Sequence, residues 1–397
     1  MKRLDKSAGM KDAVIVGVSR TPVGKMRGTL ASFSAVELGA MTMKKVVEEH
    51  KVNPKDIDEI IMGNLFDSQT FNFARVAALE AGFPIEVPAI TIDRQCSSSL
   101  NAVAWAAMLI SSGTCEVVLA GGVESHSQKP FYVKSPEKAF PDKLEFLSGQ
   151  TTNEEYGNPS MIETAEKLAK IYNISRRECD EFALASHLKA EAAWQRGFYD
   201  DETFPFHIPQ KKGVPKVFKK DECVRADTNL EVLSKLNPVM SGDGVVTAGN
   251  SSPLNDGASA ILIMSREKSA EYGLEPLAKI GAFASAGVDP SIMGIGPVYS
   301  TRKLLKNTGL SIDDFDIIEI NEAFAAQSLA CIRELGIDMN KVNPNGGAIA
   351  IGHPNAASGG IVVARTAREM VEKDLSRGLI TFCVGGGQGF SLILERG

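Results

Sequence analysis

The 397-residue sequence predicts an α/β protein built from two similar domains. Three observations support this prediction. Short runs of apolar and β-branched residues alternate with longer segments of helical periodicity, which is typical of βαβ units around a largely buried sheet. The same order of elements occurs twice along the chain. A middle region of different composition, with scattered proline and lysine, separates the two copies.

The apolar runs of the first half are short and rich in β-branched residues, as expected for strands that are covered on both faces. The segments between them carry apolar residues at helical spacing. We expect strands at Ala13–Val18, Glu59–Met62, Ala89–Ile92 and Val117–Ala120, and helices at Ser34–Glu49, at Ala74–Ala81 and from beyond residue 92 to about Ser112.

The second half repeats this plan. We expect strands at Pro276–Gly281, Phe315–Ile320 and Leu379–Cys383, and helices at Tyr299–Asn307, Glu322–Leu335 and Ser358–Lys373. In each half a reactive side chain precedes a helix of small residues, and that helix leads into an apolar strand that ends in glycines. Cys96 and His353 occupy these equivalent places. Corresponding loops of two facing domains would bring both side chains into one cleft.

The region from about 127 to 250 is predicted to be a lobe inserted into the first domain. Ser160 and Ser175 each stand three residues before a glutamate, which is the pattern of a capping box at a helix start. Gly197 suits the end of the second of these helices. The residues at Ser259–Met264 resemble those at Phe390–Leu394, so each domain is expected to close on a matching strand. We therefore expect an N-terminal domain of residues 10–127 plus 252–275, an inserted domain of residues 128–251 and a C-terminal domain of residues 276–397.

Composition argues against several classes of protein. The hydrophobic share of 44% and the charged share of 23% are those of a globular protein, and the net charge of −6 argues against nucleic-acid binding. Six cysteines are scattered without a CxxC pair, which argues against a zinc site and against a disulfide-stapled scaffold. We expect reduced thiols in a cytoplasmic protein, with no metal, no signal peptide and no membrane contact.

Cys96 is the first candidate for chemistry, because it lies where an apolar strand gives way to a helix. The free N–H groups and the dipole of a helix start favour thiolate over thiol, and the thiolate is the nucleophilic form. We therefore expect an activated cysteine at this position. A small buried cysteine without a role is the alternative that this residue alone leaves open.

Three further motifs offer catalytic groups. His353 lies among five glycines between Asn343 and Gly360, and suits either a general base or an ordinary turn histidine. Cys383 ends a strand just before glycines whose N–H groups suit an oxyanion hole, or it is a buried strand cysteine. Asn321 lies between a strand and a helix, as a helix cap or as an amide that holds a catalytic water. Taken alone, this position favours the cap.

A basic stretch lies in the inserted domain. It contains Lys211, Lys212, Lys216, Lys219, Lys220 and Arg225, interrupted by Asp221 and Glu222. A solvated hairpin is one interpretation. A site for a phosphorylated cofactor is the other, because lysine and arginine supply the charge and the donors that phosphate binds.

These pieces together resemble the thiolase family over nearly the whole chain, from about Asp12 to Arg396. The matching blocks, in the family's order, are Arg94-Gln-Cys-Ser-Ser98, Gly121-Gly-Val-Glu-Ser125, Val246-Thr-Ala-Gly-Asn250 with Leu254-Asn-Asp-Gly257, Asn321-Glu-Ala-Phe324, Gly352-His-Pro354 and Cys383-Val-Gly-Gly-Gly387. The resemblance implies duplicated βαβαβαββ domains that form an αβαβα layered core, with an inserted loop lobe.

The resemblance also implies a ping-pong mechanism in which Cys96 takes the acyl group from an acyl-CoA. His353 would deprotonate Cys96, and Cys383 would move the proton on or off the α-carbon of acetyl-CoA. Asn321 would hold a water that stabilises the enolate oxygen together with His353. The N–H groups of Cys96 and Gly385 would form a second oxyanion hole.

The residues that the resemblance implies in contact with coenzyme A are Ser252, Arg225, Met161, Met293, Phe324 and Ala248. Arg225 belongs to the basic stretch, which favours the functional interpretation of that stretch. Three places depart from the family's pattern. Ser99 and Pro253 stand where glycine is usual, and Asn355-Ala356 replaces the common Ile-Gly. These departures bear on the shape of the acyl pocket and on a CoA loop, but they remove none of the implied catalytic groups.

The substrate is less closely defined. Coenzyme A and acetyl-CoA are implied as substrates rather than as tightly bound cofactors, and a homodimer or homotetramer is implied by the family. Ser160 stands where acetoacetyl-specific members usually carry a histidine, and Arg94–Ser98 resembles degradative 3-ketoacyl-CoA thiolases, so the degradative type is favoured. Two alternatives stay open. One is a condensing enzyme of ketoacyl synthase type, which would be expected to use two histidines or a His/Asn pair, and the other is a catalytically silent protein that binds acyl-CoA.

Overall fold

A ten-stranded mixed sheet crosses the molecule in the order β10-β11-β12-β9-β1-β8-β5-β3-β4, with β2 paired to β8. The computed structural model describes residues 10–135, 143–147, 149–210, 212–240 and 242–397. The strands of the sheet are β1 (Ala13–Arg20), β2 (Gly24–Lys25), β3 (Glu59–Gly63), β4 (Ala89–Ile92), β5 (Val117–Ser125), β8 (Asn255–Ser265), β9 (Ala278–Gly287), β10 (Ile317–Ile320), β11 (Arg377–Val384) and β12 (Gln388–Glu395).

The sheet consists of two halves with the same plan. In the N-terminal half β3 pairs parallel with β5, and β5, β8 and β1 follow in antiparallel pairs. In the C-terminal half β10 pairs parallel with β11, and β11, β12 and β9 again follow in antiparallel pairs. The halves join where Val14 and Ile15 of β1 pair with Lys279 and Ala278 of β9. The predicted repeat is therefore confirmed, with β8 and β12 as equivalent closing strands.

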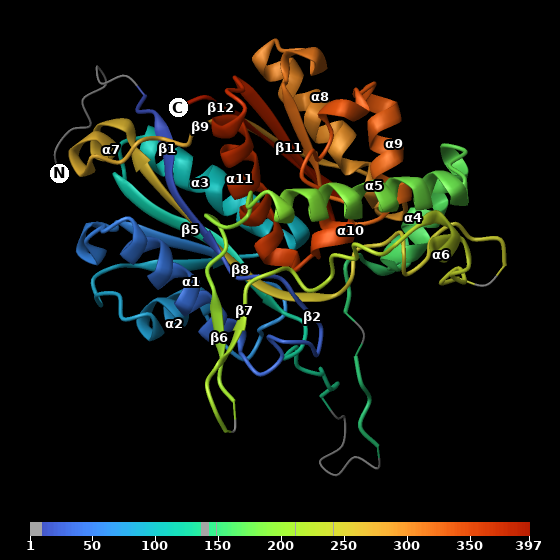
Figure 1. Cartoon of the computed structure of the whole chain (residues 1–397), viewed down its shortest axis with the longest axis horizontal. Coiled ribbons are helices and arrows are strands. Elements are labelled where there is room, and N and C mark those ends of the chain that lie inside the picture. The colour runs from blue at the N-terminus through green and yellow to red at the C-terminus, as the bar shows by residue number, and fades with distance from the viewer. Residues whose placement is uncertain (1–9, 136–142, 148, 211, 241) are drawn as a thin grey trace.

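Helices lie between the two halves and on their outer faces (Figure 1). In the middle, α3 (Ser98–Ser111) and α11 (Asn355–Glu372) lie against each other and contact strands of both halves. The outer helices are α1 (Ala35–Glu49) and α2 (Phe73–Glu80) on the N-terminal half, and α8 (Gly296–Thr308) and α9 (Ala325–Leu335) on the C-terminal half. The central core accordingly combines residues of both halves, such as Ile263 of β8 and Phe382 of β11. These are the αβαβα layers that the family resemblance implies.

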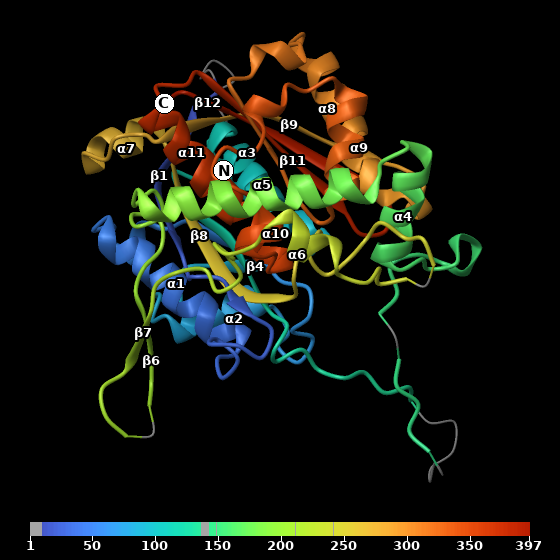
Figure 2. The ribbon, with the colours of Figure 1, turned by 45° about the vertical axis from the view of Figure 1, so that its right-hand side comes forward.

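The inserted region consists of helices, one hairpin and the loops that connect them. Its elements are α4 (Met161–Ile171), α5 (Arg176–Gln195), β6 (Phe206–Ile208), β7 (Lys216–Phe218) and α6 (Leu230–Ser234). Two short helices outside this region are α7 (Arg266–Tyr272) and α10 (Ala348–Ile351). Ser160 and Ser175 form capping boxes, as predicted, and Gly197, with a φ of 77°, follows the end of α5. The β6–β7 hairpin extends away from the sheet (Figures 1 and 2), and α5 packs against α10 (Figure 2).

A buried ion-pair cluster joins the inserted region to β1. Arg20, at the end of β1, donates to Glu202 at 2.6 Å and to Asp221 at 2.7 Å, and all three side chains are buried. Removing one partner of a buried ion pair typically costs about 3–5 kcal/mol, because it leaves an uncompensated charge in the interior. The cluster thus fixes both ends of the segment that carries the hairpin.

The helix starts differ from the predicted ones at two places that matter for the site. The helix predicted from Ser358 begins at Asn355, directly after the N-cap residue Pro354. The helix predicted from Glu322 begins at Ala325, because Phe324 is held in an extended conformation by a β-bridge to Ser251. Residues 321–324 are therefore a loop rather than a helical turn.

Candidate active site

Cys96 lies on a strained turn between β4 and α3. The preceding residue, Gln95, has a φ of 47°, a left-handed conformation that is uncommon outside glycine. Gln95 N–H donates to the Asp93 carboxylate at 2.7 Å, which helps to hold this conformation. Sγ of Cys96 is thereby presented to the C-terminal half of the molecule. There it accepts from Nδ2 of Asn355 at 3.4 Å and from the backbone N–H of Gly385.

The thiol of Cys96 is not the easily ionised group that the sequence predicts. Burial raises its pKa above the usual value, and the donors from Asn355, Gly385 and its own backbone offset this only in part. The neighbouring Glu124 carboxyl adds to the increase when it is ionised. The prediction that the helix start alone produces a thiolate is therefore wrong. Ionisation of Cys96 near neutral pH calls for a base.

His353 offers an unprotonated nitrogen from the loop between α10 and α11. Its Nδ1 lies 2.6 Å from Oγ of Ser358, and Ser358 donates its own proton to the Pro354 carbonyl at 3.2 Å. Nδ1 of His353 therefore carries the ring proton, and Nε2 keeps its lone pair. Burial lowers the pKa of His353 to about 3, and a charge on His126 would lower it in the same direction, so the ring is neutral at physiological pH.

Asn321 is not a helix cap, since α9 begins only at Ala325. Its backbone N–H donates to the carbonyl of Thr381 in β11 at 3.0 Å, which holds the residue at the end of β10. Its buried side chain directs Nδ2 to Nε2 of His353 at 3.5 Å. Oδ1 has no hydrogen-bond partner among the described residues. A buried carbonyl oxygen without a partner is costly, and it suits an amide that binds a polar group of a ligand or water.

Cys383 ends β11 with its side chain fully buried. Around it lies an apolar cluster, whose members are Met293, Ala323, Met161 and Phe324. Burial holds the pKa of the Cys383 thiol well above its usual value, and a charge on nearby Cys96 acts in the same direction. Cys383 is therefore an undissociated S–H group close to Cys96. The N–H of Gly385 points at Cys96 from the same turn.

One backbone segment connects the His353 loop with the Asn321 loop. Leu254 pairs with His353 in a parallel bridge, and Ser251 pairs with Phe324 in an antiparallel one. Between them, Ser252 N–H donates to the Ala323 carbonyl at 3.0 Å. Ser252, Phe324, Met161 and Met293, four of the residues implied in CoA binding, thus lie on segments that contact one another beside Cys383.

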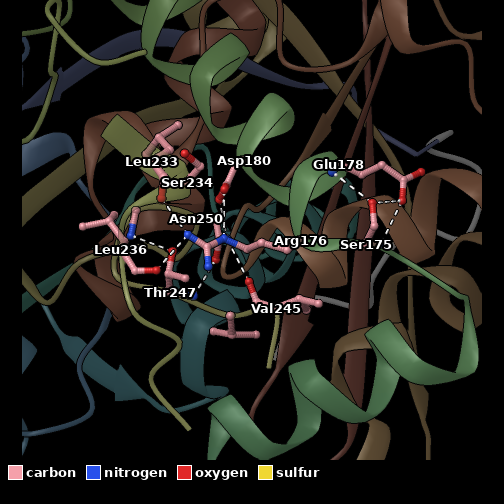
Figure 3. Close-up of polar contacts among 12 residues, drawn as sticks. Ser175, Arg176, Glu178, Asp180, Leu233, Ser234, Leu236, Val245, Thr247 and Asn250 are labelled. Atoms are coloured by element: carbon pink, nitrogen blue, oxygen red, sulfur yellow. Dashed lines mark hydrogen bonds and ion pairs between the residues drawn. The ribbon is translucent and has the colours of Figure 1, made fainter. Parts of the chain in front are cut away.

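The turn that carries Ala248, another implied CoA residue, is held by the amide of Asn250 (Figure 3). Its Nδ2 donates to Asp180 of α5 and to the Val245 carbonyl, both at 2.9 Å, and its Oδ1 accepts from Thr247 N–H at 2.8 Å. Asn250 is fully buried, whereas Ala248 is exposed at the tip of the turn.

The α5 end of this network is held by Arg176. Its Nε donates to Asp180 at 2.8 Å, and its Nη2 donates to the carbonyls of Leu233 and Leu236 at 2.6 and 2.9 Å (Figure 3). Because Asp180 contacts both Arg176 and Asn250, the inserted region determines the path of the chain into Ser252.

Arg225 lies apart from this group. Its side chain is exposed, and its backbone N–H donates to Nδ1 of His187 at 3.2 Å. Among the described residues, no hydrogen bond or ion pair reaches its guanidinium group. The nearby lysines fit the solvated-hairpin interpretation, because Lys216 is exposed in β7 and Lys220 pairs with Glu191 at 2.6 Å. Lys211 lies outside the described residues.

The helices that carry the two halves of the site approach each other closely. A side chain at Gly359 of α11 would meet the backbone nitrogen of Leu100 in α3 at 2.3 Å, so only glycine permits this contact. At the adjacent positions, Ser99 Oγ accepts from Gly360 N–H at 2.9 Å. Ser99, which departs from the usual glycine, therefore bonds to α11 instead of pointing its hydroxyl at Cys96.

Three residues near Cys96 were not singled out as functional from the sequence. Asn355 was noted only as a departure from the family's pattern, yet it contacts the sulfur. His126 bonds to Asn355, and Glu124, whose pKa is raised to about 8 by burial, accepts from the backbone of Ala356. The signal for Glu124 and His126 was their place at and just after the end of an apolar strand, two and four residues beyond Gly122.

The described residues contain no group of three or more His, Cys, Asp or Glu side chains arranged to hold a metal ion. Within the same part of the chain, no helix is both long enough and apolar enough to cross a membrane.

Comparison with known proteins matches both halves of the chain to one family. Residues 13–267 match the family model described as thiolase, N-terminal domain, and residues 274–396 match the one described as thiolase, C-terminal domain. The chain is 45% identical over 392 residues to an acetyl-CoA acetyltransferase of Pseudomonas aeruginosa, covering 98% of this chain and 100% of that protein. It is 44% identical over 401 residues to a beta-ketoadipyl-CoA thiolase of Acinetobacter baylyi, with the same coverage.

A solved structure supports the same grouping. Human mitochondrial 3-ketoacyl-CoA thiolase in complex with CoA superimposes with a TM-score of 0.91 at 38% sequence identity, covering 98% of this chain and 100% of that one. The similarity therefore includes both sheet halves and the inserted region.

Proposed function

The chain belongs to the thiolase family of acyltransferases, and we propose that it cleaves 3-ketoacyl-CoA with free CoA, and catalyses the reverse condensation, through an acyl-enzyme on Cys96. The observation that supports this most directly is the set of groups around the sulfur. Donors from Gly385 and Asn355 point at Sγ, and an undissociated thiol lies close by at Cys383. His353, whose ring is neutral, stands two residues before Asn355 in the chain.

In the first half-reaction, His353 takes the proton of Cys96, and the thiolate attacks the 3-keto carbon of the substrate. The bond between C2 and C3 breaks, the acyl group stays on sulfur, and the electron pair leaves as the enolate of acetyl-CoA. Cys383, with its S–H intact, protonates C2 of this enolate. The N–H groups of Cys96 and Gly385 stabilise the oxygen of the attacked carbonyl, and Asn321 with His353 stabilises the enolate oxygen through a water.

In the second half-reaction, free CoA releases the acyl group. Before this step the proton that His353 took from Cys96 passes to the Cys383 thiolate, which returns both groups to their starting states. His353 then accepts the CoA thiol proton, the CoA sulfur attacks the thioester, and Cys96 leaves as a thiolate that takes this proton back from His353. All of these steps run in reverse for condensation, in which Cys383, as thiolate, removes the α-proton of acetyl-CoA.

Coenzyme A is proposed to lie along the segment from Ala248 to Ser252 and against the apolar cluster of Met161, Met293 and Phe324. Four of these residues already lie on contacting segments beside Cys383, so a thioester held there would reach both cysteines. Arg225 is proposed to contact the phosphates from the exposed edge of the inserted domain, because a guanidinium presents donors whose geometry matches phosphate.

The substrate class is proposed as 3-ketoacyl-CoA of the degradative type, with acetoacetyl-CoA included. Ser160, which caps α4 directly before Met161, supports this choice, because acetoacetyl-specific members usually carry a histidine there. A cytoplasmic homo-oligomer, with domains at 10–127 plus 252–275, 128–251 and 276–397, completes the proposal.

The test is a spectrophotometric assay of acetoacetyl-CoA cleavage with free CoA, followed by a series of longer 3-ketoacyl-CoA substrates. Wild-type enzyme should cleave at least one chain length, and Cys96→Ala should cleave none. Binding without cleavage on every chain length would contradict the proposal and favour a silent acyl-CoA binding protein. Decarboxylation of a malonyl thioester without thiolysis would favour a ketoacyl synthase.

A further inference from the structure

A polar pair beside the nucleophile has no place in the steps above. Asn355, the first residue of α11, donates from Nδ2 to Sγ of Cys96 at 3.4 Å. Its Oδ1 lies 2.7 Å from Nε2 of His126. His126 directly follows β5, so it reaches Asn355 from the N-terminal half, while α11 belongs to the C-terminal half. The residue in contact with the sulfur is therefore oriented from across the interface between the halves.

The contact with His126 decides which end of the amide faces the sulfur. An asparagine side chain can turn over and present either its carbonyl oxygen or its NH₂ group. Burial lowers the pKa of His126, so its ring is neutral at physiological pH and carries one N–H. With that N–H on Nε2, Oδ1 of Asn355 is the acceptor, and the NH₂ group must point at Cys96. A thiolate accepts such a hydrogen bond strongly, because the acceptor is charged.

The imidazole is itself fixed in place. Its ring makes an edge contact with the Phe66 ring at 4.9 Å between centroids, and Nζ of Lys129 lies 4.0 Å from the Phe66 centroid. His126 is therefore held by an aromatic contact that does not involve its nitrogens. A residue that keeps the ring but lacks the nitrogen can separate the two roles.

We propose that Asn355 is a catalytic residue that donates to the Cys96 thiolate, and that His126 is the positioning residue that turns its amide toward the sulfur. The donor would act whenever sulfur carries negative charge, that is, when the nucleophile forms and when it leaves the acyl group. The isoleucine that is common at position 355 in the family has no such donor. The role of this donor in acyl transfer rests on the proposed function. The hydrogen bond from Asn355 to the Cys96 thiolate does not depend on that function.

Other ionisable groups face this pair and stay unchanged in the variants below. Glu124 of β5 and Cys383 of β11 face Cys96, while Lys129 and His353 face His126. All of these groups are present in every variant. A difference in pH profile between variants therefore comes from the Asn355 amide and its orientation.

The first experiment measures how fast iodoacetamide alkylates Cys96 as a function of pH, with the modified peptide identified by mass spectrometry. The rate follows the thiolate fraction. In Asn355→Ile the pH midpoint should rise, and the rate constant at about pH 8 should fall about tenfold, since one charge-assisted donor is lost. A midpoint equal to that of the wild-type enzyme would overturn the proposal. Ser99→Ala, which changes a neighbouring contact to α11 without touching the sulfur, should leave the midpoint in place.

The second experiment changes only His126 and stays informative if Asn355→Ile does not fold. His126→Phe keeps the ring that packs on Phe66 but loses the N–H, and it should raise the midpoint in the same direction as Asn355→Ile. His126→Gln supplies a side-chain N–H and should restore most of the wild-type profile. Equal profiles for His126→Phe and wild type, or failure of His126→Gln to recover, would overturn the positioning role.

The double variant shows whether His126 acts on Cys96 through Asn355 or independently of it. If His126 acts through Asn355, His126→Phe should add nothing in the Asn355→Ile background. Additive effects would contradict the proposal. Because alkylation needs no turnover, a protein that shows these shifts but cleaves no 3-ketoacyl-CoA would support the pair while contradicting the proposed function.

Discussion

Nδ2 of Asn321 lies 3.5 Å from Nε2 of His353, at the point where the loop after β10 meets the loop before α11. Both groups are buried, and Oδ1 of Asn321 has no partner among the described residues. The pair is neutral because burial keeps the pKa of His353 at about 3. In the proposed mechanism Nε2 of His353 takes the proton of Cys96 and becomes a donor. Together with the Asn321 amide and its water, it then stabilises negative charge that forms on the enolate oxygen.

Asn321→Ala should separate the two half-reactions. Loss of one preorganised group at the enolate oxygen should lower kcat for acetoacetyl-CoA cleavage by about a hundredfold or more. Acyl-enzyme formation from acetyl-CoA uses the other oxyanion hole and should stay near the wild-type rate. Single-turnover kinetics with each substrate measures the two rates, and an equal loss in both would contradict the assignment.

Cys383→Ser should keep the nucleophile and lose the proton transfer. We expect Cys96 to be acylated by acetyl-CoA, while condensation and thiolysis fall by about a thousandfold, because a serine hydroxyl exchanges a proton with carbon far less readily. Cys331→Ser is the matched control, since Cys331 is also a buried cysteine but donates to the Gly294 carbonyl at 3.2 Å. Similar losses in both variants would point to packing rather than to chemistry.

Glu124 should make stability fall with rising pH. Burial raises the pKa of its carboxyl from 4.5 to about 8, so between these values the folded protein keeps a proton that the unfolded chain has released. The free energy of unfolding then falls by up to about 1.4 kcal/mol per pH unit in this window. Glu124→Gln cannot titrate and should lack this slope. Urea denaturation at steps from pH 4.5 to about 8 compares the two proteins, and parallel curves would contradict the prediction.

Asn250→Ala should loosen the segment that leads to Ser252. Loss of its buried hydrogen bonds to Asp180, Val245 and Thr247 should lower the free energy of unfolding by about 2 kcal/mol and raise the KM for CoA more than it lowers kcat. Arg177→Ala removes an exposed ion pair with Glu181 on the same helix and should cost less than about 0.5 kcal/mol. A KM for CoA that stays at the wild-type value in Asn250→Ala would count against this role for the segment.

The duplicated plan could be predicted because each half repeats the same apolar periodicity and the same order of reactive residue, small-residue helix and glycine-ended strand. The capping boxes at Ser160 and Ser175 follow local rules, so the sequence also located both helix starts. The start of α9 did not follow local rules. It depends on the bridge between Phe324 and Ser251, which brings together residues 73 positions apart and turns Asn321 from an expected cap into a buried, partly unpaired amide.

The electrostatics of the candidate site did not follow from the sequence. A helix start suggested a low pKa for Cys96, but burial, which depends on how α3 and α11 pack, outweighs the local dipole. The contact between His126 and Asn355 joins residues 229 positions apart. Neither residue, read in its own stretch of sequence, predicts a contact with the other. Such pairs follow from tertiary packing alone.

The central claim is that Cys96 carries the acyl group, and mass spectrometry of the trapped intermediate tests it most directly. The protein is mixed with acetyl-CoA, quenched in acid to preserve the thioester, digested and mapped. We expect the acetyl group on the peptide that contains Cys96, its absence in Cys96→Ala, and its loss when free CoA is added before the quench. Turnover of 3-ketoacyl-CoA together with an acetyl group on another residue, or on none, would contradict the account.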